Sequence, residues 1–193
     1  MARDTQGNDL ESVKVPITGF AAIGPKGGTS MTKAQLEAAS LSLPSGYEYL
    51  GLFTTDGGPA EASEAEDPLE FFQIGYTLPG DDGKLTETLV LAEDNDAVRT
   101  LRYGDTGTGS SYVMKSAVPE GRYPYLRVTR YRNGTEMRRA GLVTVTSIEP
   151  VQETRGEIRA VSVTFSFVYQ DELTTSAGGD PVGGMFIDAY IEV

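Results

Sequence analysis

Residues 157–169 constrain the fold of this chain more than any other segment, because apolar and polar side chains alternate along them. The apolar members recur at every second position: Val161, Val163, Phe165, Phe167 and Tyr169. The residues between them include Ser162, Thr164 and Ser166. Alternation of this kind sends the two sets of side chains to opposite faces of a strand. It predicts a strand with one buried face and one hydroxyl-rich face in contact with water.

The segments before this strand indicate a larger sheet. Residues 122–131 and 135–148 have strand character and flank Asn133 and Gly134, whose tolerance of positive φ favours a tight two-residue hairpin. Further strands are expected at 13–23, 47–53, 69–76, 85–91 and 185–193. The 23 glycines and 10 prolines agree with a chain of strands and loops. The fold class is therefore predicted to be mostly β.

One helix stands out at residues 94–103. Asp94 or Asn95 can cap its N-terminus, and Gly104 can end it. Three apolar residues share one side and are expected to pack the helix on the sheet: Ala97, Val98 and Leu101. A second, shorter helical segment is expected within 31–41, capped by Thr29 or Ser30.

The chain is predicted to form one β domain over residues 13–170. Residues 1–12 are polar and are expected to form a flexible N-terminal arm. Residues 54–68 carry no apolar period and are expected to form a long acidic loop, either functional or disordered. Residues 171–193 are expected to be a C-terminal extension with a short strand.

Charge is sorted by position along the sequence. Residues 61–96 hold eleven acids against one lysine, whereas residues 97–140 hold nine basic residues against three acids. Such blocks on identical subunits would attract each other and favour ordered self-association. The candidates for contact between subunits are Glu61, Glu64, Glu66 and Asp67 on the acidic side and Arg127, Arg130, Arg132, Arg138 and Arg139 on the basic side. Scattered solubilising charge and a nucleic-acid-binding surface are the alternative interpretations.

The sequence predicts no catalytic residues, no cofactor and no metal site. It contains no cysteine and no histidine, which excludes thiolate and imidazole chemistry. The glycine-rich stretch at residues 24–30 does not have the spacing of a phosphate-binding loop. No apolar run approaches the length of a membrane span and residues 1–15 are polar, so we expect no membrane partner and synthesis in the cytoplasm.

The order of three segments resembles one known family. LPSGYEYLGLFTTDGG (43–58) is followed by LTETLVLAEDN running into DAVRTLRYG (85–104), and then by the stretch from RYPYLRV to SFVYQ (122–170). In this order they resemble the major tail tube proteins of long-tailed, non-contractile bacteriophages. A tryptophan that many relatives carry near Phe71 or Phe72 is missing here.

The resemblance implies a β-sandwich or barrel-like domain with one helix packed on its side. It also implies hexameric rings that stack into the tail tube of the virion, with DNA only passing through the channel. The implied partners are other copies of the chain and the tape measure, tail tip and tail terminator proteins, and no enzymatic activity is implied. Two alternatives stay open: a soluble β-sandwich binding module for carbohydrate or a cell surface, and another phage part such as a tail terminator or head decoration protein.

Overall fold

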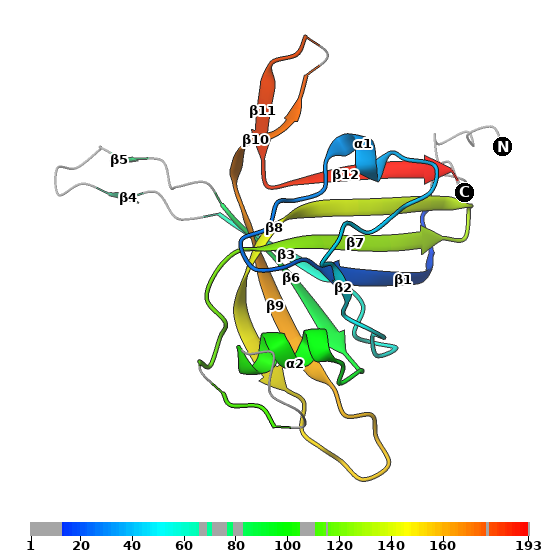
Figure 1. Ribbon diagram of the computed structural model, residues 1–193, viewed down its shortest axis with the longest axis vertical. Helices are drawn as coiled ribbons and strands as arrows, with labels where there is room; N and C mark the ends of the chain where they lie inside the picture. Colours follow the sequence, from blue (N-terminus) through cyan, green and yellow to red (C-terminus); the bar gives the residue numbers. More distant parts are fainter. Residues whose placement is uncertain are drawn as a thin grey trace. The chain divides into compact units, whose positions relative to one another are not determined.

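The computed structural model describes residues 13–65, 69–70, 77–78, 83–104, 111–114, 116–176 and 178–192 (Figure 1). Of these residues 48% lie in strands, mainly of an antiparallel sheet, and 8% are helical, which confirms the predicted mostly β fold class. The chain divides into two compact units, each assembled from separate stretches. The first unit comprises Met1–Leu50, Tyr123–Leu142 and Tyr169–Val193, and the second comprises Gly51–Arg122 and Val143–Val168.

The first unit is built on a sheet with the strand order β2-β1-β7-β8, and β12 pairs with β8. The strands of this sheet are β1 (Pro16–Ile23), β2 (Glu48–Tyr49), β7 (Tyr123–Tyr131), β8 (Thr135–Pro150) and β12 (Phe186–Glu192). The unit also contains a short helix and a separate two-stranded hairpin: α1 (Lys33–Leu36), β10 (Gln170–Thr175) and β11 (Pro181–Gly184). Strand β8 runs on into the second unit.

A hydrophobic core joins α1 to one face of this sheet. Its buried members come from the helix region and three strands: Met31, Leu36, Leu126, Val128, Ala140 and Ala189. Phe20 on β1 lies opposite Val128 on β7 and packs against this core. The helix is shorter than expected and is capped by Thr32, whose side chain accepts a hydrogen bond from the backbone of Gln35 while Gln35 bonds back to the backbone N–H of Thr32.

The hairpin between β7 and β8 differs from the predicted two-residue turn. Its loop holds three residues, 132–134, since β7 ends at Tyr131 and β8 begins at Thr135. Gly134 has φ +83°, whereas no described residue other than glycine has a positive φ. A two-residue turn of the expected type needs positive φ at both positions. Asn133 instead uses its side-chain oxygen to accept from the backbone N–H of Thr135, so the turn takes the three-residue form.

The second unit contains a sheet in the order β8-β9-β6-β3. Its own strands are β3 (Ala60–Glu64), β6 (Lys84–Leu91) and β9 (Val161–Val168), with a separate pair formed by β4 (Leu69–Glu70) and β5 (Thr77–Leu78). In β9 the side chains at 161, 163, 165 and 167 are buried, so the predicted alternation is confirmed over these residues. The prediction was wrong at Tyr169, which lies beyond the end of β9 and is 53% exposed. The hydroxyl-rich face is half-buried rather than fully wet, because Thr164 bonds to Thr88 of β6 at 2.9 Å.

The predicted helix is present as α2 (Asp96–Tyr103). Asn95 is its cap and accepts a hydrogen bond from the backbone of Val98, while Gly104 ends it with φ +69°. The three residues expected to pack the helix are all buried: Ala97, Val98 and Leu101.

One expectation about the extensions needs correction. The acidic segment 54–68 is not a loop throughout, because residues 60–64 form β3 and pair with β6. This strand was not expected because a strand held by its neighbour needs little apolar pattern of its own. The strand expected at 185–193 is present as β12, which pairs with β8 over seven consecutive residues. The predicted arm at 1–12 lies outside the described residues.

Candidate assembly surface

Strand β3 is the edge strand of the second unit. It ends the strand order and pairs only with β6 among the strands that the structure describes. All five of its residues are exposed, including the two acids that the sequence predicted as contacts, Glu61 and Glu64. The other two acidic candidates, Glu66 and Asp67, lie outside the described residues. An edge strand presents backbone N–H and C=O groups that another chain can pair with.

The arginines predicted on the basic side fall into two groups. Arg130 and Arg132 are exposed, near and in the hairpin loop. The other three are buried, with 5%, 3% and 5% of their surface exposed: Arg127, Arg138 and Arg139. These three side chains are therefore largely enclosed by their own unit rather than spread over its surface, and their contact with another copy stays a prediction.

Arg138 belongs to an internal charged network. Its Nε donates to Glu136 Oε1 at 2.7 Å, and its Nη1 donates to the backbone oxygens of Leu36 at 2.8 Å and Ala38 at 2.6 Å. Arg130 donates to the second oxygen of Glu136 from Nε at 3.3 Å and from Nη2 at 2.9 Å. Glu136 thus joins two arginines, and Arg138 fastens the end of α1 to the sheet.

Arg139 pairs with a residue that the sequence analysis did not single out. Its Nε and Nη2 each donate to Asp188 on β12 at 2.7 Å, in the two-pronged geometry that suits guanidinium and carboxylate. The same guanidinium lies 3.9 Å from the ring centroid of Phe186. The sequence contains one sign of this ion pair: Asp188 is an acid between apolar neighbours, Ile187 and Ala189, in the strand expected at 185–193.

A cavity of about 310 Å³ opens beside the Arg138 network. Phe20 and Tyr49 form part of its wall and meet edge to face, with ring centroids 5.2 Å apart. The side chains that matter for its chemistry are Arg130, Glu136 and Arg138. Two guanidinium groups share one carboxylate there, so the cluster carries a net charge of +1.

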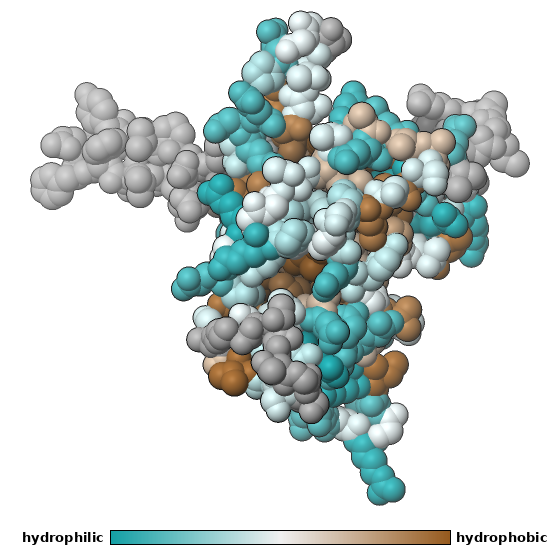
Figure 2. Space-filling view, viewed as in Figure 1, coloured by the Kyte–Doolittle hydropathy of each residue, from teal (hydrophilic) through white to brown (hydrophobic). Residues whose placement is uncertain are grey.

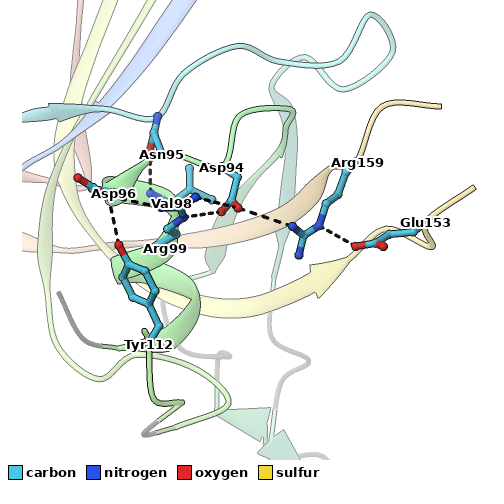
Figure 3. Close-up of polar contacts among 8 residues, drawn as sticks. All are labelled: Asp94, Asn95, Asp96, Val98, Arg99, Tyr112, Glu153 and Arg159. Carbon is cyan, nitrogen blue, oxygen red and sulfur yellow. Dashed lines mark hydrogen bonds and ion pairs between the residues drawn. The ribbon is translucent and has the colours of Figure 1, made fainter. Parts of the chain in front are cut away.

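A second charged network surrounds the start of α2 (Figure 3). The carboxylate of Asp94 receives hydrogen bonds from Arg99 at 3.1 and 3.3 Å and lies 3.6 Å from Arg159. Arg159 in turn pairs with Glu153 at 2.7 Å. Tyr112 donates to Asp96. These contacts tie the helix start to the residues before β9, and we assign this network a structural role.

The two networks predict how stability depends on pH. Burial alone would raise the pKa of Glu136, but hydrogen bonds from Arg138 and Arg130 outweigh it and leave the pKa below its ordinary value of 4.5. The hydrogen bond from Arg99 likewise lowers the pKa of Asp94. A lowered pKa means that the unfolded chain binds the proton more readily, so stability is present above the ordinary pKa and is lost as pH falls.

We therefore expect urea denaturation to show decreasing stability from pH 5 towards pH 3. Part of this decrease should be missing in Asp94→Asn and in Glu136→Gln, because these side chains no longer titrate. The control is Glu157→Gln, which removes an exposed acid. A pH dependence identical in wild type and both network variants would contradict the assignment.

Exposed apolar side chains are scattered on the face drawn in Figure 2, where brown apolar atoms are separated by teal and pale ones. Val13, Val15 and Ile17 are exposed before and in β1. Lys14 places its ammonium 3.4 Å from the ring centroid of Tyr190, which covers one face of that exposed tyrosine.

No helix among the described residues is long and apolar enough to cross a membrane. In the same part of the chain, no group of three or more Asp or Glu side chains is placed to hold a metal ion.

Comparison with known proteins gave one structural likeness that we report. No protein-family model matches the sequence, and no curated protein is similar to it. A solved structure of the SPP1 tail tube, from solid-state NMR and cryo-EM, aligns with 77% of this chain and 72% of its own. The sequence identity is 11% and the TM-score is 0.40. Such values are too low to assign a function to this chain.

Proposed function

We propose that this chain is a structural protein that assembles with copies of itself. The observation that carries the proposal is the edge strand β3, which is exposed at all five residues and pairs on one side only within the described chain. A polar edge of this kind is completed by strand pairing with another chain. Closure of identical subunits into a ring would leave no such edge exposed.

The kind of assembly that we propose is the tail tube of a long-tailed, non-contractile bacteriophage. The support for this finer assignment is the order of segments in residues 43–58, 85–104 and 122–170. The subunits would close into hexameric rings, and the rings would stack into a tube in the virion. The tape measure, tail tip and tail terminator proteins would then be its partners. The net charge of −12 suits a channel through which DNA slides, since like charge disfavours phosphate contacts.

Electron microscopy of the purified protein tests the proposal directly. We expect negative-stain images to show rings or tubes, and light scattering to rise with protein concentration. A protein that remains monomeric at every concentration and salt condition would contradict self-assembly. Irregular aggregates without a repeating diameter would contradict the tube.

A matched pair of lysine substitutions tests the part played by β3. Lysine on an edge strand opposes pairing with another edge. We expect Ala62→Lys, on the exposed edge, to reduce the amount of assembled protein. The control is Gln152→Lys, which adds the same charge at an exposed residue outside any strand. Equal assembly of the two variants would show that β3 is not at the contact.

A further inference from the structure

The cavity beside Arg138 has donors that no described residue uses. Arg138 is buried and donates through Nε and Nη1, so its Nη2 has no partner among the described residues. Arg130 binds Glu136 through Nε and Nη2 and leaves Nη1 without a described partner. A guanidinium carries five N–H donors, so both side chains keep donors that an acceptor entering the cavity can bind.

The net positive charge of Arg130, Glu136 and Arg138 favours an anionic group as the acceptor for the unused N–H donors. Two arginines share the single carboxylate of Glu136, so one positive charge is uncompensated in a site where Arg138 and Glu136 are almost fully removed from water. A second carboxylate would balance this charge and accept from the unused nitrogens. Arginine binds carboxylates with short, charge-assisted hydrogen bonds. The side chain of Arg130 is 49% exposed, so the site is reachable from solvent.

The same chain carries an acid that suits this site. Glu64, at the end of β3, is exposed and makes no ion pair with any described residue, although Lys84 lies opposite it on β6. An exposed edge strand can bring such a side chain to a neighbouring molecule.

We propose that the cavity between Arg130 and Arg138 is a receptor for the carboxylate of Glu64 from a second copy of this chain. The inference rests on the proposed self-assembly and adds the pair of groups that recognise each other. It also separates the roles of the two arginines. Arg138 ties α1 to the sheet and presents its Nη2 to the cavity, whereas the half-exposed Arg130 lies at the opening of the cavity.

The first experiment tests the cavity without any assembly. Sodium acetate replaces sodium chloride at constant ionic strength, and the Nε–H signals of the arginines are followed by NMR in protein kept too dilute to assemble. We expect the Arg130 and Arg138 signals to shift and saturate, while the signal of exposed Arg132 does not saturate. Shifts that are absent, or that match those of Arg132, would overturn the site.

The second experiment tests the occupant by light scattering at low salt. We expect Glu64→Gln and Arg130→Gln each to slow assembly about tenfold, because steering between opposite charges is lost. The double variant should be no slower than either single one, since both remove the same pair. The control Glu157→Gln removes an exposed acid outside β3 and should assemble at the wild-type rate. A thermal melt establishes that Arg130→Gln is folded.

The outcomes separate this inference from the proposed function. Wild-type assembly by Glu64→Gln, or additive effects in the double variant, would overturn Glu64 as the occupant while leaving self-assembly intact. A wild-type protein that never assembles would overturn the proposed function and the second-copy occupant together. In that case saturable acetate binding would show a free-anion site.

Discussion

Replacement of Arg138 by alanine is expected to lower the free energy of unfolding by about 3 to 5 kcal/mol. That is the usual loss when one partner of a buried charged pair is removed. Because Glu136 would keep its contact with Arg130, we expect a value near the lower end of this range. Here Glu136 would lose its 2.7 Å contact, and the backbone oxygens of Leu36 and Ala38 would lose their donor. Urea denaturation followed by circular dichroism measures the change.

The control for Arg138→Ala is Arg132→Ala in the same hairpin. Arg132 is exposed, and an exposed substitution of this kind usually changes stability by no more than about 0.5 kcal/mol. Equal stability of the two variants would mean that Arg138 is not held in the interior. The sequence-based hypothesis of charge sorting placed Arg138 on the surface, and it predicts that Arg138→Ala and Arg132→Ala are equally stable.

Replacement of Leu101 by alanine is expected to cost about 2 to 5 kcal/mol, because it removes buried methyl groups and leaves a cavity. Leu101 is 2% exposed on the buried side of α2, beside Val98. The same substitution at Leu52 is the control, since Leu52 belongs to the same unit and is 68% exposed. Thermal melts of both variants give the comparison.

The result that would contradict the placement of α2 is a Leu101→Ala protein as stable as Leu52→Ala. A loss confined to Leu101→Ala would establish that the helix is a packed element of the second unit. Since the lost burial destabilises the subunit itself, we also expect this variant to assemble poorly.

The features that the sequence predicted well are those determined by residues close together in the sequence. The buried face of β9 follows from alternation over eight residues, and α2 follows from a cap, an apolar side and Gly104. Each pattern is complete within about ten residues. Local side-chain direction alone is enough to determine it.

The features that the sequence missed depend on distant partners. Arg138 is buried because backbone oxygens about one hundred residues earlier accept its hydrogen bonds, and Arg139 because Asp188 arrives on β12. Net charge over a block of sequence does not contain that information. Strand β3 was missed for a related reason: its residues have no apolar period, and its conformation is set by pairing with β6.

The interleaved path of the chain has a consequence for synthesis on the ribosome. The first unit needs β1 from near the beginning, β7 and part of β8 from the middle, and β12 from residues 186–192. Proteins usually fold from the N-terminus as domains emerge. Here β8 emerges without its neighbour β12, and Arg139 emerges without the carboxylate of Asp188. The nascent chain therefore carries an open edge on β8 until residues 186–192 have been made, and irregular strand pairing is favoured during that interval.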